Sequence, residues 1–214
     1  MIRTVVHHEL QAKVIDWVAA GKVTPVKNQG SCGSGWAFST VAAMESFFMF
    51  NATEQSLLSE QQLVDCSTRY GNRGCSEGSL SYAYNYIEAN GISDGENYPY
   101  VGSEQPCKKE GGPNQLPAYT QWNRKGECIH LTDFLELRPA AVVVDATNFA
   151  PYRSGVFSGC GTKINHAVLA VGVTEQYWVV KNSWSTSWGE KGFMRLALGN
   201  TCGICHDPVC PGFC

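Results

Sequence analysis

The chain has 214 residues, of which 43% are hydrophobic and 16% charged, with a formal net charge of −3 and a pI near 5.9. This length and apolar content suffice for one large domain or two small lobes. The weakly acidic balance gives no positive field, which argues against nucleic acid or an anionic membrane as a partner. No apolar run approaches the length needed to cross a bilayer, so we expect no membrane span.

Ten cysteines are many for a chain of this length. Disulfides in an oxidising compartment are the favoured interpretation, and a metal or redox site in a reducing compartment is the alternative. The triplet Asn51-Ala52-Thr53 is a glycosylation sequon, which agrees with secretion, although Asn51 is equally well an ordinary residue at a helix end. No signal peptide or pro-segment is recognisable, so we expect a mature or trimmed form.

The first half of the sequence predicts helices. One begins at residue 33 or 34 and runs to about 50, and its apolar residues lie on more than one face, as in a helix buried between two layers. Ser59 and Gln62 resemble a capping box at the start of a second helix. A third helix is predicted over residues 79–90, ending at Gly91, which can adopt a left-handed turn. Residues 99–138, rich in Gly, Pro and polar side chains, are interpreted mostly as loop.

The second half predicts strands. Apolar runs of strand length cover residues 140–144, 167–173, 177–181 and 193–198, with turn-forming glycines between them. Helices followed by strands favour an α+β protein with two lobes rather than alternating β–α–β units. A cleft between two lobes is a natural ligand site.

Residues 29–36 read Gln-Gly-Ser-Cys-Gly-Ser-Gly-Trp. They match the thiol-protease signature C-G-[SA]-C-[WY], except that Gly35 stands at the second cysteine, the nucleophile. His166 and Asn182 follow 131 and 147 residues after Gly35, within the spacing typical of such enzymes. A thiol protease needs a thiolate at a helix N-terminus, an imidazole, a group that orients the imidazole, and oxyanion donors. The sequence offers candidates for all of these except the thiolate.

Other segments extend this match along the chain and occur in the same order as in such enzymes. They are residues 25–30, 36–39, 74–76, 98–100 and 183–189, together with Cys66. These segments resemble the papain family of cysteine proteases, and its cathepsin-L-like branch in particular, over nearly the whole chain. The resemblance implies a single peptidase domain over residues 1–214 with an active cleft between two lobes. A helical lobe would cover about 20–121, and a β-barrel-like lobe about 122–210 plus the N-terminal segment.

The resemblance also implies roles for single residues. His166 would be general base and acid, Asn182 would orient the imidazole, and Gln29 would donate to the oxyanion with the backbone N–H of position 35. Trp184 would shield the His166–Asn182 bond from water, and Gly78 would bind the substrate main chain. The walls of the second specificity pocket would be Leu80, Val143, Ile164, Ala167 and, near the floor, Asp207.

Two acidic positions near the expected cleft bear on substrate specificity. Glu77 stands where the family usually has a glycine, which places a charge beside the cleft. An acid at the floor of the second pocket would admit Arg as well as Leu or Phe, so we expect Asp207 to broaden the preference. The alternative is that Asp207 is a solvated residue of the C-terminal tail.

Gly35 has no side chain, so no thiolate–imidazolium pair and no acyl-enzyme can form. Only the residual catalysis of oxyanion hole and binding would remain, about 10³–10⁴ over water, and we expect an inactive chain that still binds peptides. Two explanations compete: deliberate inactivation of a protease, and a natural pseudo-protease that binds peptides or proteins. The first is favoured, because the other parts are complete and Met1 directly precedes the mature-like region, as in a recombinant protein.

The family resemblance pairs six cysteines, as Cys32–Cys75, Cys66–Cys107 and Cys160–Cys202. The remaining four allow three connectivities, of which Cys205–Cys210 with Cys128–Cys214 is preferred. Residues 202–206 also match the haem-attachment pattern C-x-x-C-H and, with Cys210, hint at zinc. Both are disfavoured, because Cys202 is required by Cys160, and we expect no metal or cofactor.

The partners implied by the resemblance are peptide and protein substrates, the protein's own pro-segment and cystatin-type inhibitors. We expect a monomer in a lysosome or vacuole, or secreted.

Overall fold

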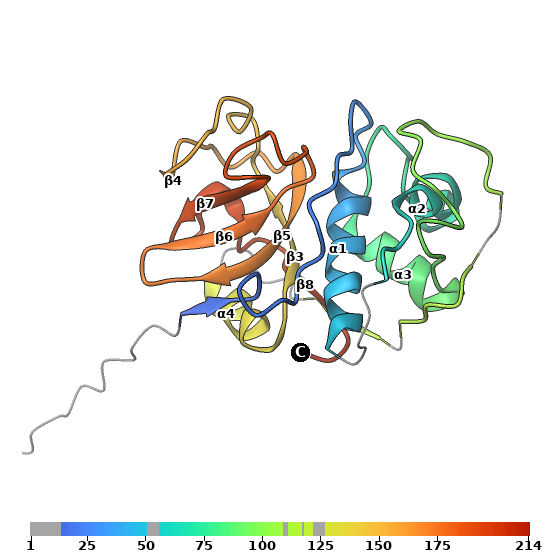
Figure 1. Cartoon of the computed structure of the whole chain (residues 1–214), viewed down its shortest axis with the longest axis horizontal. Helices are drawn as coiled ribbons and strands as arrows, with labels where there is room; N and C mark the ends of the chain where they lie inside the picture. Colours follow the sequence, from blue (N-terminus) through green and yellow to red (C-terminus); the bar gives the residue numbers. More distant parts are fainter. Residues whose placement is uncertain (1–13, 51–55, 109–110, 117, 122–126) are drawn as a thin grey trace, which may run out of the picture.

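A computed structural model describes residues 14–50, 56–108, 111–116, 118–121 and 127–214. Helix α1 (Gly35–Met49) runs through the middle of the molecule, with the sheet on one side and helices α2 (Glu60–Cys66) and α3 (Leu80–Asn90) on the other (Figure 1). Every residue of α1 is buried except Phe47 and Phe48. The expected helix between two layers is therefore confirmed. The sequon at Asn51 lies outside the described residues.

The ends of the helices follow local chemistry. Ser59 caps α2 by accepting the backbone N–H of Gln62 at 3.0 Å. The second half of the expected capping box is replaced, because the backbone N–H of Ser59 donates to the carbonyl of Ser93 at 3.0 Å and the side-chain oxygen of Gln62 accepts the N–H of Ser93 at 2.7 Å. A 3₁₀ turn, η1 (Ser67–Tyr70), follows α2. Helix α3 ends at Gly91, whose φ of 73° favours glycine.

The described strands form one sheet in the order β2-β8-β3-β5-β6-β7-β4, with β1 paired to β5. All neighbours are antiparallel except β4 and β7. The strands are β1 (Ile15–Asp16), β2 (Tyr119–Gln121), β3 (Ala140–Val144), β4 (Val156–Phe157), β5 (His166–Val173), β6 (Tyr177–Lys181), β7 (Phe193–Ala197) and β8 (Val209–Pro211). The four predicted strands correspond to β3, β5, β6 and β7, and the α+β class is confirmed.

The interpretation of residues 99–138 as mostly loop was wrong at its C-terminal end, where β2 and helix α4 (Cys128–Leu137) lie. Leu131, Phe134 and Leu135 of α4 are buried, with the i, i+3, i+4 spacing of one helical face. The side chain of Trp17 donates to the carbonyl of Leu135 at 2.8 Å and holds the helix against the N-terminal segment. The periodicity was thus present in the sequence, beside a Gly- and Pro-rich stretch that obscured it.

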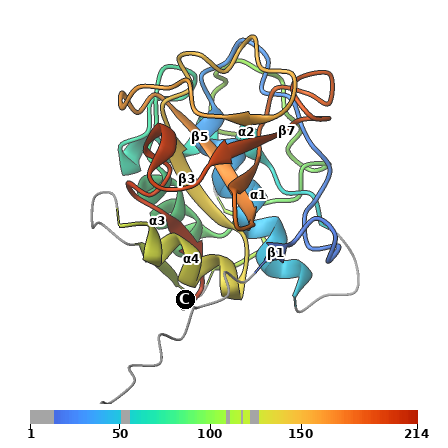
Figure 2. The ribbon, with the colours of Figure 1, turned by 90° about the vertical axis from the view of Figure 1, so that its left-hand side faces the viewer.

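The sheet separates two cores. Along β5, Leu169 and Val171 face the core that contains α1, α2 and α3, whereas Val168 and Ala170 face the core that contains α4. Figure 2 shows α4 below the strands, away from α2. Because both faces of the central strands β3 and β5 are covered, β3 and the part of β5 that follows His166 are continuous apolar runs rather than alternating ones. No described helix combines the length and apolar character needed to cross a bilayer.

The structure forms the three disulfides that the resemblance implies, Cys32–Cys75, Cys66–Cys107 and Cys160–Cys202. The preferred pairing of the other four cysteines was wrong, because the bonds are Cys128–Cys205 and Cys210–Cys214. The first joins the start of α4 to the loop after η2 (Thr201–Gly203), and a pairing between parts so distant in sequence follows only from the fold. Both cysteines of the C-x-x-C-H motif are in disulfides, Cys202 with Cys160 and Cys205 with Cys128.

Candidate active site

Two loops, far apart in sequence, meet at the start of α1. The backbone N–H of Gln29 donates to the carbonyl of Ser183 at 2.8 Å, and the N–H of Ser185 donates to the carbonyl of Lys27 at 3.1 Å. This short antiparallel pairing places Gln29 beside the residues that follow β6. The segment before α1 is therefore positioned by the sheet.

His166 is the first residue of β5, and Asn182 directly follows β6. Nε2 of His166 lies 2.8 Å from Oδ1 of Asn182. That amide atom also accepts the backbone N–H of Ser183 at 2.8 Å, and an N–H can only donate, so the atom facing the ring is the oxygen. Nε2 must therefore carry the proton.

The other ring nitrogen then faces the beginning of α1. In a neutral imidazole protonated at Nε2, Nδ1 is the acceptor. A Cβ built on Gly35 would lie 2.5 Å from both Nδ1 and Cε1 of His166 and 3.4 Å from Oε1 of Gln29. A side chain at position 35 would thus point directly at the basic nitrogen, and the ring would have to turn slightly aside to admit it.

The imidazole is shielded on one face by an indole. The rings of His166 and Trp184 stack with centroids 5.0 Å apart. Burial lowers the pKa of His166, and the hydrogen bond to Asn182 raises it by a smaller amount, so the net pKa lies below the ordinary value of histidine. The ring therefore favours its neutral, proton-accepting form.

Gln29 is buried, and its side-chain amide is fixed at both ends. Nε2 donates to the carbonyl of Cys32 at 2.9 Å, and Oε1 accepts from the hydroxyl of Ser183 at 2.6 Å. A carbonyl can only accept, which settles the orientation of the amide. Because an amide nitrogen carries two hydrogens, one remains for a further acceptor in the cleft.

The first turn of α1 supplies more donors. Ser34 precedes the helix but makes no side-chain cap, because its hydroxyl lies 2.8 Å from that of Tyr100. The first N–H groups of a helix have no partners within the helix and carry the positive end of its dipole. This end of α1 is suited to an oxyanion or to a thiolate.

A cleft opens in front of these groups. Gly78 forms part of its wall against the indole of Trp36, and a Cβ on Gly78 would collide with that ring, so only glycine fits. The residues lining the cleft are Gln29, Gly33, Gly35, Trp36, Ser76, Glu77, Gly78, Ser79, Leu80, Gln121, Val143, Ile164, Asn165, His166, Ala167, His206 and Asp207.

Most of the residues expected in a catalytic or binding role share this cleft. Leu80, Val143, Ile164 and Ala167 supply apolar walls, and Asp207 lies among them with its side chain about one-third exposed. Asn182 and Trp184 do not line the cleft and lie behind His166.

Five other polar lining residues, Ser76, Ser79, Gln121, Asn165 and His206, were not named as site residues from the sequence. Gln121 and His206 are brought in by the pairing of β2 with β8 and by the turn before β8, which no local sequence pattern indicates. Asn165 was recoverable from the sequence, since it directly precedes His166.

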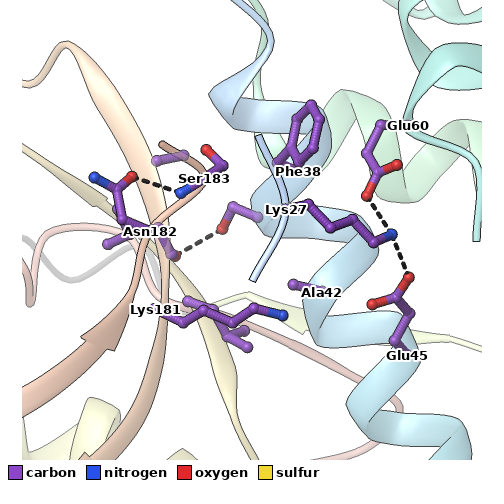
Figure 3. A pocket seen from close by; sticks show the side chains of 12 residues that line it. Lys27, Phe38, Ala42, Glu45, Glu60, Lys181, Asn182 and Ser183 are labelled. Atoms are coloured by element: carbon purple, nitrogen blue, oxygen red, sulfur yellow. Dashed lines mark hydrogen bonds and ion pairs between the residues drawn. The ribbon is translucent and has the colours of Figure 1, made fainter. Parts of the chain in front are cut away.

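A second group of polar residues is buried farther along α1, and Figure 3 shows it beside a small cavity. Nζ of Lys27 lies 2.6 Å from a carboxylate oxygen of Glu45 and 2.6 Å from one of Glu60. Nζ of Lys181 donates to the hydroxyl of Thr24 at 3.0 Å, and that hydroxyl donates to Glu45 at 2.5 Å. Strand β6, the N-terminal segment, α1 and α2 are thereby joined through charged side chains and the hydroxyl of Thr24.

Burial dominates the electrostatics of this charged cluster. It raises the pKa of Glu60 to about 7, although Lys27 acts in the opposite direction. It lowers the pKa of Lys181 to about 8, with Glu45 opposing. Burial also acts to lower the pKa of Lys27, but the two carboxylates outweigh it and the pKa is raised. Lys27 therefore stays charged as the bridge between two acids.

Comparisons with known proteins agree with this fold and with this site. The family model described as papain family cysteine protease matches residues 11–212. The chain belongs to the papain family of cysteine proteases.

The chain is similar to several named relatives. It is 45% identical over 203 residues to a cathepsin L-like proteinase of Fasciola hepatica, covering 89% of this chain and 62% of that protein. It is 42% identical to cathepsin L 2 of Paramecium tetraurelia, covering 92% of this chain and 63% of the relative. The chain thus spans slightly less than two thirds of the length of these two relatives.

Among solved structures, the chain resembles the Carica candamarcensis cysteine protease CMS1MS2 in complex with E-64. The TM-score is 0.86 at 39% sequence identity, with 92% of this chain and 97% of that chain covered. This likeness establishes the papain-like fold.

Proposed function

We propose that this chain is the peptide-binding body of a cysteine endopeptidase in which Gly35 occupies the nucleophile position. One observation carries the proposal: Asn182 fixes the His166 ring so that its basic nitrogen faces the direction in which a side chain at position 35 would project. This is the geometry in which an imidazole takes a proton from a thiol.

With a thiol at position 35, the chemistry is acyl transfer followed by hydrolysis. His166 accepts the thiol proton, the thiolate attacks the scissile carbonyl, and the oxyanion receives the free amide hydrogen of Gln29 and the N–H of position 35. His166 then protonates the leaving amine and activates water for hydrolysis of the acyl-enzyme. Without the thiol, binding and the oxyanion donors remain, so bound peptide stays intact.

The substrates proposed are peptides held along the cleft, with their main chain at Gly78. The pocket of Leu80, Val143, Ile164 and Ala167 accepts an apolar side chain at the position before the scissile residue. Asp207 among them admits Arg as well. The test is Asp207→Ala combined with Gly35→Cys: an unchanged ratio of Arg to Leu cleavage would contradict this role.

Restoring the nucleophile tests the function. All ten cysteines are in disulfides, so Gly35→Cys introduces the only thiol. We expect peptide hydrolysis at acid pH and alkylation by iodoacetamide that persists below pH 6, because the helix dipole and His166 stabilise a thiolate. Gly35→Ser is the matched control, with a side chain of similar size and no thiol.

Two further measurements make this test decisive. Disulfide mapping checks that the new thiol has not exchanged with the neighbouring Cys32–Cys75 bond. Adding His166→Ala to Gly35→Cys should abolish both turnover and low-pH alkylation. A folded Gly35→Cys protein that binds peptide but never cleaves it would favour the alternative, a natural pseudo-protease that acts by binding.

Cellular setting and partners follow from the same proposal. Five disulfides favour an oxidising compartment, and we propose a lysosomal or vacuolar location, or secretion. We also propose that a pro-segment and cystatin-type inhibitors occupy the same cleft in a monomeric protein. Competition between such an inhibitor and a labelled peptide tests this.

A further inference from the structure

The hydroxyl of Tyr100 lies between two segments that the proposed chemistry needs. It donates to the backbone carbonyl of Gln29 at 2.8 Å, and its oxygen lies 2.8 Å from the hydroxyl oxygen of Ser34. A carbonyl can only accept and a phenol has a single hydrogen, so the hydroxyl of Ser34 must donate to the oxygen of Tyr100. Tyr100 therefore joins the residue that carries the oxyanion amide to the residue that precedes α1.

Tyr100 is itself held in place by the helical lobe. The N–H of the next residue, Val101, donates to the side-chain oxygen of Gln61 on α2 at 2.9 Å. The ring of Tyr100 packs edge to face against Phe38 of α1, with centroids 4.9 Å apart. Burial raises the pKa of Tyr100 above its ordinary value of 10.0, so the hydroxyl keeps its hydrogen at acid and neutral pH. The phenol is thus a fixed donor.

These contacts place Tyr100 at both ends of the loop formed by residues 29–34. The disulfide between Cys32 and Cys75 holds the middle of this loop. The side-chain amide of Gln29 donates one hydrogen to the carbonyl of Cys32 at 2.9 Å, within the same loop. A shift of the loop ends would therefore redirect the second amide hydrogen, which is the one left for a substrate oxygen.

The bond to Tyr100 also keeps the hydroxyl of Ser34 away from the start of α1. A serine before a helix usually has extended backbone angles, and its hydroxyl accepts an N–H of the first turn, which stabilises the helix by about 1 kcal/mol. Ser34 has φ −97° and ψ 17°, and its side chain makes no such bond. A hydroxyl turned toward the first turn would compete with an oxyanion for these N–H groups.

We propose that Tyr100 is a positioning residue for the oxyanion site, acting through the carbonyl of Gln29 and the hydroxyl of Ser34. This rests on the proposed function, because it adds a residue on which the same reaction depends. Without the phenol hydroxyl, the loop of residues 29–34 shifts and Ser34 is free to cap α1. Both changes weaken the donors that meet the oxyanion, which forms only during the reaction, whereas peptide binding along the cleft is retained.

The test compares acylation with binding. Tyr100→Phe, added to Gly35→Cys, removes the hydroxyl and keeps the ring. We expect the single-turnover acylation rate with a saturating peptide anilide to fall about 5- to 20-fold, less than the 10²–10³-fold loss on deleting an oxyanion donor outright. The dissociation constant of the same peptide, measured by calorimetry with Gly35 in place so that no peptide is consumed, should change by less than about twofold.

Tyr98→Phe is the matched control in the same segment. The hydroxyl of Tyr98 donates to Asp65 at 2.9 Å instead of to Gln29, so its loss should leave the acylation rate of Gly35→Cys unchanged. Circular dichroism and urea denaturation verify that the variants fold. Ser34→Ala keeps the proposal testable if Tyr100→Phe does not fold. It removes one of the two contacts of the phenol and should lower the acylation rate by a smaller factor, again without weakening peptide binding.

A double-mutant cycle distinguishes positioning from a general loss of structure. Gln29→Ala removes one oxyanion donor itself, so in that background Tyr100→Phe should lower the acylation rate by only about two- to threefold. An equal loss with and without Gln29 would show that Tyr100 does not act through this amide and would refute its role.

The outcomes separate this inference from the proposed function. If Gly35→Cys cleaves peptides and Tyr100→Phe lowers the acylation rate no more than Tyr98→Phe does, the role of Tyr100 is refuted and the proposed function survives. If a folded Gly35→Cys protein cleaves no peptide, the proposed function fails, and the role of Tyr100 fails with it.

Discussion

The cleft and the charged cluster both lie along α1, yet they use polar residues in opposite ways. In the cleft, His166 is held by one hydrogen bond and a stacked indole and faces an open space. In the cluster, Glu45 accepts from Lys27, Thr24 and the backbone of Leu58, and it is 1% exposed. His166 therefore has room for a partner from outside the chain, whereas the hydrogen-bond partners of Glu45 all come from the chain itself.

The largest expected effect is on stability, in the cluster. Glu45→Ala leaves Lys27 with one carboxylate fewer and orphans buried donors, so we expect a loss of about 3–5 kcal/mol in the free energy of unfolding. His166→Ala, in the cleft, should cost about 1 kcal/mol or less, because its hydrogen bond is single and beside solvent. Urea denaturation of both variants measures the difference, and equal losses would show that the cleft is as structural as the cluster.

The cluster should also make stability depend on pH. The pKa of Glu60 is raised from 4.5 to about 7 in the folded state, so the folded protein binds the proton more tightly than the unfolded chain. This contribution is full below pH 4.5 and is lost as the pH rises to about 7, a change on the order of 3 kcal/mol. In Glu60→Gln the fall in unfolding free energy over this interval should be absent. A slope identical to that of the parent would contradict the raised pKa.

In the cleft, the comparison predicts that substitutions of Asn182 shift the pKa of the His166 imidazole. Asn182→Ala removes the hydrogen bond that raises the pKa of His166, so the pKa should fall further, by about one unit or less. Asn182→Asp should raise it, since a negative charge favours the imidazolium. NMR titration of the ring measures both shifts, and movement in the same direction would contradict the assigned contact.

The smallest effect is expected at the rim of the cleft. Arg73 and Glu77 form an ion pair at 2.9 Å, but their side chains are 72% and 63% exposed. Arg73→Ala should therefore change the unfolding free energy by about 0.5 kcal/mol or less, and less still in high salt. Thermal unfolding of Arg73→Ala at two ionic strengths measures this effect. The loss of stability in Glu45→Ala is the reference for a buried ion pair.

Elements could be predicted from the sequence where apolar residues or family motifs extend over a long segment. The buried helix α1 and the strands β3, β5, β6 and β7 follow from apolar runs and periodicity, and the family resemblance rests on motifs around Gly35, His166 and Asn182. Short elements were missed for a physical reason. Strands such as β4 have two residues and are stable only because their neighbours provide hydrogen bonds and cover.

The amino-acid sequence by itself determined which chemical groups the protein has, including a glycine where the family signature has its second cysteine, because side-chain identity is a local property. Tertiary structure alone decided which groups meet. It joined Cys128 to Cys205, brought His206 next to the pocket, and placed two lysines and two glutamates in one buried cluster. Such contacts depend on how distant segments pack, and burial then sets the charge state of the groups involved, which no local pattern encodes.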